Sequence, residues 1–150
     1  MGRLALGLVV PLLIGVAVGV GGFTFVYARG ASYLGNDPKA CANCHIMQAH
    51  FDAWTKASHR AVATCNDCHA PHSFLRKYWV KAENGFWHSF AFTTGWFHEP
   101  IRIRDKNRAV TEEACRDCHG AITQTIDAAP QHAAGALACT GCHATVGHLE

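Results

Sequence analysis

Hydrophobic and polar positions divide the chain into an apolar N-terminal segment and a mixed remainder. Residues 4–28 run LALGLVVPLLIGVAVGVGGFTFVYA without a charge, between Arg3 and Arg29. A stretch of this length can cross a bilayer with some tilt, so the pattern predicts a membrane-spanning helix. The alternative is a cleaved signal peptide, but its apolar stretch is only about 7–15 residues long. We therefore expect an uncleaved anchor over residues 1–29.

A second pattern covers residues 74–97, FLRKYWVKAENGFWHSFAFTTGWF, which hold 9 of the 15 aromatic residues. Apolar positions recur there at three- and four-residue spacing from Leu75 to Phe90, with charged side chains between them, and this predicts an amphipathic helix. Trp and basic residues are typical of helices at a membrane interface, so we expect the apolar face to lie among lipid headgroups. The alternative is that the aromatic rings pack on the edges of bound cofactors.

Composition then narrows the class of protein. The chain has 150 residues with 8 Cys and 11 His, and its formal net charge is only +2. A nucleic-acid-binding protein is normally distinctly basic, so we expect no nucleic-acid partner. The hydrophobic content of 49% excludes a disordered tail. The high content of Cys and His indicates bound cofactors instead.

All eight cysteines lie in four short motifs, CANCH, CNDCH, CRDCH and CTGCH. They are Cys41, Cys44, Cys65, Cys68, Cys115, Cys118, Cys139 and Cys142. Strings of the form CxxCH are typical of c-type haem attachment, in which two thioether bonds hold the macrocycle and the adjacent His reaches the iron. Zinc sites and disulfides also use cysteine pairs, but neither requires His at the next position. The sequence therefore predicts four covalently bound haems.

The motifs also predict topology and spacing. Haem is attached on the outer side of an energy-transducing membrane, so we expect an inner-membrane, single-pass protein with a cytoplasmic N-terminus and residues 30–150 in the periplasm. The first cysteines of motifs one and two lie 24 residues apart, as do those of motifs three and four. This repeat predicts two dihaem units, over residues 38–73 and 112–148.

The expected fold follows from the size of the cofactors. The residues outside the membrane must enclose four large macrocycles, which leaves little room for a core made of protein alone. We expect a mainly α fold of short helices and loops around the haems, with little β structure. Thr111, followed by Glu112 and Glu113, predicts a helix that begins just before the third motif.

The strings around the motifs resemble a known family. CANCHIM has the form CxxCHxM, SHRAVATCNDCHAPH covers residues 58–72, a KA pair precedes the third motif and VGH follows the fourth. With the N-terminal anchor, these features resemble the NapC/NirT family of membrane-anchored tetrahaem cytochromes c. Within that family they resemble the NrfH type, the small quinol-oxidising subunit of cytochrome c nitrite reductase. The resemblance covers nearly the whole chain.

For the first two haems the resemblance implies unusual axial ligands. Met47 takes the place of His45 on the first haem, whose other face stays open. A thioether is a softer ligand than imidazole and favours ferrous iron, which suits a haem that accepts electrons first. Cys41 lies only 13 positions after Ala28, so we expect this haem close to the bilayer. The second haem has His69, and relatives supply its other ligand as a Lys of the partner subunit.

The third and fourth haems are implied to have two histidine ligands each. His148, in the terminal VGH, corresponds to the distal ligand of the third haem, opposite His119. His59 corresponds to the distal ligand of the fourth haem, opposite His143. No role follows for four further histidines, His50, His72, His98 and His132.

The resemblance also implies a quinol site in residues 74–97, at the open face of the first haem. The family has a Lys before Ala, matched by Lys81, and an acidic residue seven positions later, where this chain has His88. A sister pattern has its acid where this chain has Asn84, beside Glu83. Because quinol oxidation releases protons as well as electrons, we expect His88 and Glu83 together to replace the missing carboxylate. The alternative is that His88 binds the iron of the first haem.

Together these features favour a quinol dehydrogenase that oxidises menaquinol and passes electrons through four haems to a periplasmic reductase. The resemblance implies cytochrome c nitrite reductase as the acceptor. We expect its catalytic multihaem subunit and membrane lipid as partners, in a homo-oligomer or larger complex. The alternative is a tetrahaem electron-transfer protein that serves another periplasmic reductase and has no quinol site. A terminal reductase is less well supported, because the chain is short for a substrate pocket at a haem far from the membrane.

Overall fold

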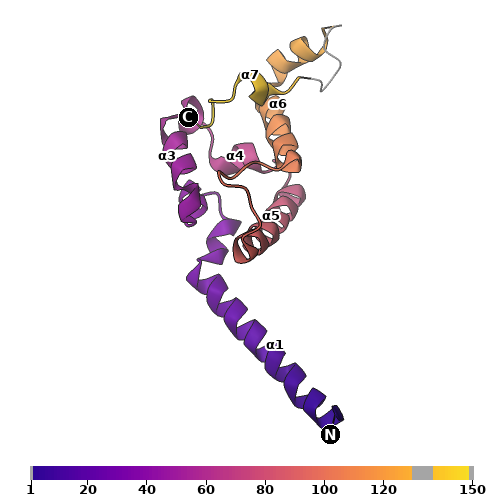
Figure 1. The fold of residues 1–150 in the computed structure, drawn as a ribbon. Helices are drawn as coiled ribbons and strands as arrows, with labels where there is room; N and C mark the ends of the chain where they lie inside the picture. The colour runs from indigo at the N-terminus through magenta and orange to yellow at the C-terminus, as the bar shows by residue number, and fades with distance from the viewer. Residues whose placement is uncertain (1, 130–136, 149–150) are drawn as a thin grey trace. The chain divides into compact units, whose positions relative to one another are not determined.

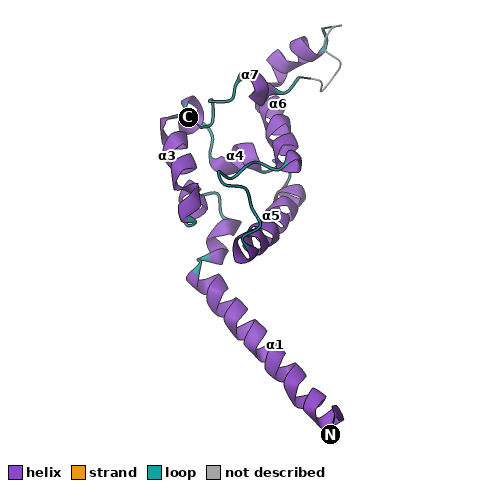
Figure 2. Ribbon diagram, in the orientation of Figure 1, coloured by secondary structure: helices purple, strands orange, loops and turns teal. Residues whose placement is uncertain are grey.

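Helices provide the regular structure of the protein. The computed structural model describes residues 2–129 and 137–148, and these residues contain helices but no strand (Figure 2). The predicted mainly α fold is therefore confirmed. The chain divides into two compact units, Met1–Gly35 and Asn36–Glu150.

The first unit consists of helix α1 (Gly2–Tyr27) and the short 3-10 helix η1 (Gly30–Leu34) (Figure 1). Within α1, Leu6–Tyr27 form a 22-residue stretch with a mean hydropathy of 2.3, long enough to cross a membrane. None of this stretch is buried inside the protein. Pro11 lies inside α1 without ending it, as membrane helices tolerate. The predicted N-terminal apolar helix is thus present.

The second unit combines short helical segments with two long helices (Figure 1). In chain order these are α2 (Pro38–Cys41), η2 (His45–Met47), α3 (Gln48–Lys56), η3 (Ser58–Ala61), α4 (Cys65–His69), α5 (Phe74–Thr94), α6 (Asp105–Asp127) and α7 (Cys139–Cys142). The first motif begins at the end of α2, and the second forms α4. The third lies within α6, and the fourth begins α7. Every motif is therefore anchored to a helix.

Local capping fixes where the first two motifs begin. Asp37 accepts a hydrogen bond from the backbone N–H of Lys39 at 2.9 Å, which caps α2. The backbone N–H and hydroxyl of Thr64 donate to the Asp67 carboxylate at 2.8 and 2.7 Å, as in the capping box of a helix start. Burial alone would raise the pKa of Asp67, but the bonds from Thr64 outweigh it and lower the pKa.

The long helix α6 differs from the sequence expectation. It begins at Asp105, so the helix start predicted at Thr111 is wrong. Thr111 lies inside the helix, where its hydroxyl bonds to the carbonyl of Asn107 at 3.2 Å. A Thr can therefore imitate a cap in sequence while bonding to the preceding turn. The backbone of α6 is kinked at His119, which has φ −104° and ψ 25°.

Buried protein surface is scarce in the described part of the chain. The buried hydrophobic residues are all small, namely Ala40, Ala57, Ala70, Val80, Val110 and Ala114. No large side chain among the described residues is fully buried. Domains of ordinary composition bury Leu, Ile and Phe, which supply most of their hydrophobic stabilisation. The helices therefore need another apolar body to pack against, as the sequence predicts for haem.

Candidate cofactor sites and quinol segment

The eight motif cysteines all lie in the second unit, and none forms a disulfide. Thiols of consecutive motifs are neighbours. The neighbouring pairs are Cys41 with Cys65, Cys68 with Cys118, and Cys115 with Cys139. Each motif therefore lies beside the next motif in the chain, an order that suits a series of electron carriers.

Histidine rings meet in pairs beside the motifs. The ring centroids of His59 and His119 are 6.0 Å apart, and those of His69 and His148 are also 6.0 Å apart. Two imidazoles on opposite sides of one metal ion have centroids about 6 Å apart, because each metal–nitrogen bond is about 2 Å long. The donor set of Cys pairs and His pairs therefore fits covalently bound haem iron.

These contacts group the predicted distal ligands differently from the resemblance. The structure places His59 beside His119, whereas the resemblance assigns it opposite His143. His148 lies beside His69 and also beside His50, whose ring centroid is 5.5 Å away. The sequence reasoning gave no role to His50. The sequence did hold one sign of such a role, because His50 comes three residues after the CxxCHxM string, on the first turn of α3.

The environment of His69 favours a neutral imidazole. Neighbouring side chains desolvate it, although part of the residue stays exposed, and this effect, followed by His148 and His50, lowers its pKa to about 4. The Thr111 hydroxyl lies 3.4 Å from His69 Nδ1 and donates to the Asn107 carbonyl. A hydrogen bond at Nδ1 leaves Nε2 available to a metal.

His72 joins the second and third motifs. Its Nε2 lies 3.0 Å from the backbone carbonyl of Asp67, and its Nδ1 lies 3.3 Å from the carboxylate of Asp117. These two aspartates occupy the same position in CNDCH and CRDCH. Because both ring nitrogens have protein partners, His72 is a structural link. His98 is exposed, and His132 lies outside the described residues.

The first motif lies close to Lys81 of α5. Met47 is half-buried at the end of η2, and His45 is exposed at its start. The hydrogen bond from Cys65, followed by the charge of Lys81, outweighs desolvation and lowers the pKa of the Cys41 thiol to about 7. The structure therefore brings the predicted quinol-site lysine and the first attachment motif together.

The four predicted quinol-site residues divide between two sides of α5. His88 follows Lys81 by seven residues, and this spacing places both on the same side of a helix. Glu83 forms an ion pair with Lys106 of α6. The Asn84 side chain accepts a hydrogen bond from Asn107 of the same helix at 3.0 Å. Glu83 is thus turned toward α6 and away from Lys81, whereas Asn84, three residues after Lys81 and four before His88, lies at the edge between their side of the helix and α6.

Desolvation affects both groups on the Lys81 side. It lowers the pKa of Lys81, with a further contribution from the charge of Lys77. It also lowers the pKa of His88, together with the charge of Arg104, although part of His88 stays exposed. A neutral His88 can accept a proton at neutral pH. This side of α5 therefore carries a cation and a base.

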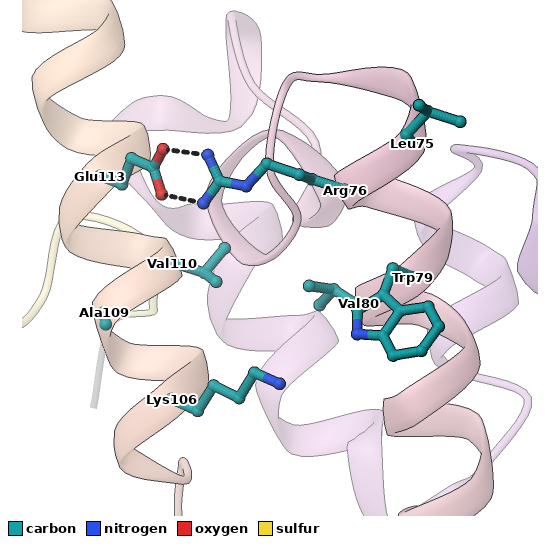
Figure 3. Close-up of a pocket in the computed structure, with 8 residues that line it drawn as sticks. All are labelled: Leu75, Arg76, Trp79, Val80, Lys106, Ala109, Val110 and Glu113. Atoms are coloured by element: carbon teal, nitrogen blue, oxygen red, sulfur yellow. Dashed lines mark hydrogen bonds and ion pairs between the residues drawn. The ribbon is translucent and has the colours of Figure 1, made fainter.

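An apolar groove of about 520 Å³ lies between α5 and α6 (Figure 3). It is lined by Leu75, Arg76, Trp79, Val80, Lys106, Ala109, Val110 and Glu113. Arg76 donates two hydrogen bonds to the Glu113 carboxylate, at 2.6 and 2.8 Å. The ion pair of Lys106 with Glu83 forms a second bridge between the helices. Long polar side chains therefore connect α5 to α6 on either side of an apolar gap.

One side of α5 carries large apolar side chains at the predicted helical spacing. Their exposed fractions are 79% for Leu75, 72% for Trp79, 63% for Phe86 and 41% for Phe90. We call these four residues, one leucine and three aromatic residues, the aromatic face. Helical spacing thus collects them on one surface, as the sequence pattern predicts.

An apolar helix of membrane-spanning length, followed by CxxCH motifs and paired histidines, defines a membrane-anchored c-type cytochrome. The chain belongs to the NapC/NirT cytochrome c family, because the model of that family's N-terminal region matches residues 3–150. The family resemblance inferred from the motifs is therefore confirmed. Membership implies covalently bound haem and an electron-transfer role in an oxidoreductase system.

Several relatives match most of the chain. It is 34% identical to the cytochrome c-type protein NrfH of Wolinella succinogenes, over 94% of this chain and 86% of that protein. It is also 34% identical to the cytochrome c nitrite reductase subunit NrfH of Nitratidesulfovibrio vulgaris, over 82% and 74%. A chain in the crystal structure of the cytochrome c nitrite reductase NrfHA complex bound to the HQNO inhibitor is 30% identical, with a TM-score of 0.62. That match covers 90% of this chain and 88% of the other.

Proposed function

We propose that the chain is the quinol-oxidising subunit of a cytochrome c nitrite reductase. It takes electrons from menaquinol and passes them to a catalytic multihaem subunit, which reduces nitrite to ammonia. The observation that carries the proposal is the match to NrfH proteins along most of the chain, together with Lys81 beside the first CxxCH motif. The two subunits would work as a larger complex in the inner membrane.

Four haems are proposed, one on each motif, and each supplies one-electron transfer when bound. Met47 would hold the iron at the first motif, with His45 beside it. His69, His119 and His143 would hold the iron at the other three motifs.

His59 and His148 are the proposed distal ligands. Their ring contacts with His119 and His69 support a ligand role for both. At the second motif the resemblance implies a Lys of the catalytic subunit as the second ligand, and His148, whose ring lies beside that of His69, is the candidate within this chain. Loss of the low-spin spectrum in a His59→Ala or His148→Ala variant would assign each residue to its haem.

Lys81 and His88 would act on quinol from the same side of α5. The ammonium group of Lys81 can bind and polarise a quinol oxygen, and neutral His88 can accept a released proton. Glu83 is retained as the second proton acceptor, which requires it to leave Lys106 and turn toward the quinol, whereas Asn84 already borders Lys81. Their bonds to α6 hold this part of the helix in place.

The membrane would surround the apolar helix and contact the aromatic face. We propose that the N-terminus is cytoplasmic and that residues 30–150 lie in the periplasm. Lys81 and His88 lie on the opposite side of α5 from the aromatic face, so menaquinol that enters beside this face would pass around the helix to reach Lys81. The exposed fractions of Leu75, Trp79 and Phe86 support this placement, because such a surface is unfavourable in water.

The decisive experiment is purification in detergent with any bound partner, followed by addition of a menaquinol analogue. We expect rapid reduction of the haems and, with the catalytic subunit present, quinol-dependent loss of nitrite. Haems that dithionite reduces but quinol does not would reject the proposed activity. That result would favour the alternative, a tetrahaem electron-transfer protein fed by another dehydrogenase.

A further inference from the structure

Glu112 holds the fourth motif against the helix that carries the third. Its carboxylate accepts hydrogen bonds from the backbone N–H of Cys139 at 2.6 Å and of Thr140 at 3.0 Å. It accepts a third bond from the Thr140 hydroxyl at 2.6 Å. Only 14% of the Glu112 side chain is exposed. Hydrogen bonds to an ionised acceptor are about twice as strong as neutral ones, so this clamp is directional and strong.

Arg116 extends the clamp from the next turn of α6. Its guanidinium lies 3.7 Å from the Glu112 carboxylate and 3.4 Å from that of Asp127. It also donates to the backbone carbonyl of Leu137 at 2.9 Å, just before the fourth motif. Since Arg116 is itself a residue of the third motif, the two motifs share one polar network.

The charge of Glu112 persists at neutral pH. Burial alone would raise its pKa, but the hydrogen bonds from Thr140, followed by those from Cys139, outweigh burial and lower the pKa. Glu112, Arg116 and Asp127 together carry one net negative charge. A negative charge near a redox centre stabilises its oxidised form, so this network bears on potential as well as on geometry.

We propose that Glu112 is a positioning residue for electron transfer between the third and fourth haems. Its carboxylate sets the distance between the two attachment sites, whose Cys115 and Cys139 thiols are neighbours. Its charge makes the fourth haem harder to reduce. The inference rests on the four-haem part of the proposed function. It adds a residue that binds neither haem nor quinol and acts through the Cys139–Thr140 backbone.

The test uses the full chain, matured with haem and purified in detergent. A Glu112→Gln variant keeps the size of the side chain and loses its charge. We expect four haems by mass spectrometry, one redox component shifted to higher potential, and several-fold slower electron transfer between haems after rapid mixing with reductant. Glu113→Gln is the matched control, because Glu113 pairs with Arg76 of α5 instead of with the fourth motif. The Glu113→Gln variant should leave the potential of that redox component unchanged.

Variants of Thr140 test the effect of geometry separately from the effect of charge. Thr140→Val removes one bond to Glu112 and keeps the carboxylate, so it should slow transfer with little change in potential. Thr140→Ser restores the hydroxyl and should restore the rate. Wild-type potentials and rates in Glu112→Gln would overturn the proposal. If that variant does not mature, a wild-type rate in Thr140→Val overturns it and a slower rate supports it.

The same measurements keep this inference apart from the proposed function. A wild-type chain that carries fewer than four haems would defeat the four-haem proposal and this inference with it. A wild-type chain with four haems that quinol does not reduce would defeat only quinol oxidation. The electron-transfer rates and redox potentials of the Glu112→Gln variant would then still test the role of Glu112.

Discussion

Two regions of the second unit are built by opposite means. The motif scaffold, made of α4, α6 and α7, is held by polar contacts such as Thr64–Asp67, His72–Asp117 and Glu112–Thr140. The aromatic face of α5 instead presents Leu75, Trp79, Phe86 and Phe90 to the surroundings. Polar contacts fix distance and angle, whereas apolar contact is non-directional.

This difference matches the function proposed for each region. Electron transfer between bound carriers depends on fixed spacing, and hydrogen bonds between consecutive motifs supply it. The surface proposed to meet lipid and quinol must tolerate a partner of variable shape, and exposed apolar side chains do so. Lys81 connects the two regions, since it lies on α5 and its charge helps to lower the pKa of Cys41 in the first motif.

The largest effect should follow from breaking the scaffold at its centre. A Cys115→Ala, Cys118→Ala variant removes the third attachment site from α6, which also contacts the second and fourth motifs. We expect three haems by mass spectrometry and quinol-driven nitrite reduction at background level. A variant with four covalently bound haems would contradict the assignment of these cysteines.

Replacing Lys81 should break the other region while sparing the scaffold. In a Lys81→Met variant we expect quinol-driven haem reduction to fall by about 100-fold, the usual contribution of a positioned acid–base group. Haem content and reduction by dithionite should stay unchanged. Lys77→Met, one turn earlier on α5, is the control and should cost much less. Equal losses in the two variants would indicate a general effect of charge.

His88 should give a smaller effect with a distinct pH dependence. Its pKa lies below the ordinary value of 6.5, so the neutral form that accepts a proton is lost only as pH falls below that value. We expect wild-type quinol oxidation to decline on that acidic side. A His88→Gln variant should be slower by about tenfold at neutral pH, less than the loss of a lone acid–base group, because Glu83 remains as the second proposed proton acceptor. A change from low-spin to high-spin haem in the variant would instead identify His88 as an iron ligand.

The sequence predicted what depends on local pattern. Residue spacing was enough for the apolar helix, the CxxCH motifs and helix α5, whose end at Thr94 is set by Gly95 in the left-handed region at φ 71°. It failed at α6, where Thr111 resembles a cap but bonds to the preceding turn. It also missed the roles of His72 and Glu112. Their partners, Asp117 and Thr140, are far away in sequence, and only packing reveals such pairs.

The smallest effect should come from trimming the aromatic face. In a Trp79→Ala, Phe86→Ala variant the apolar helix still holds the chain in the membrane. The variant therefore loses only apolar contact between α5 and the bilayer surface. We expect the KM for menaquinol to rise by about threefold with kcat unchanged, since about 0.7 kcal/mol of apolar contact corresponds to that factor.

Val62→Ala is the control for this variant. Val62 is also an exposed apolar residue, at 81%, but lies outside α5, directly after η3. It should leave the KM unchanged. A fall in kcat without a change in KM would instead place Trp79 and Phe86 against the haems, which is the alternative that the aromatic pattern left open. The same pair of variants therefore decides whether this face meets lipid or cofactor.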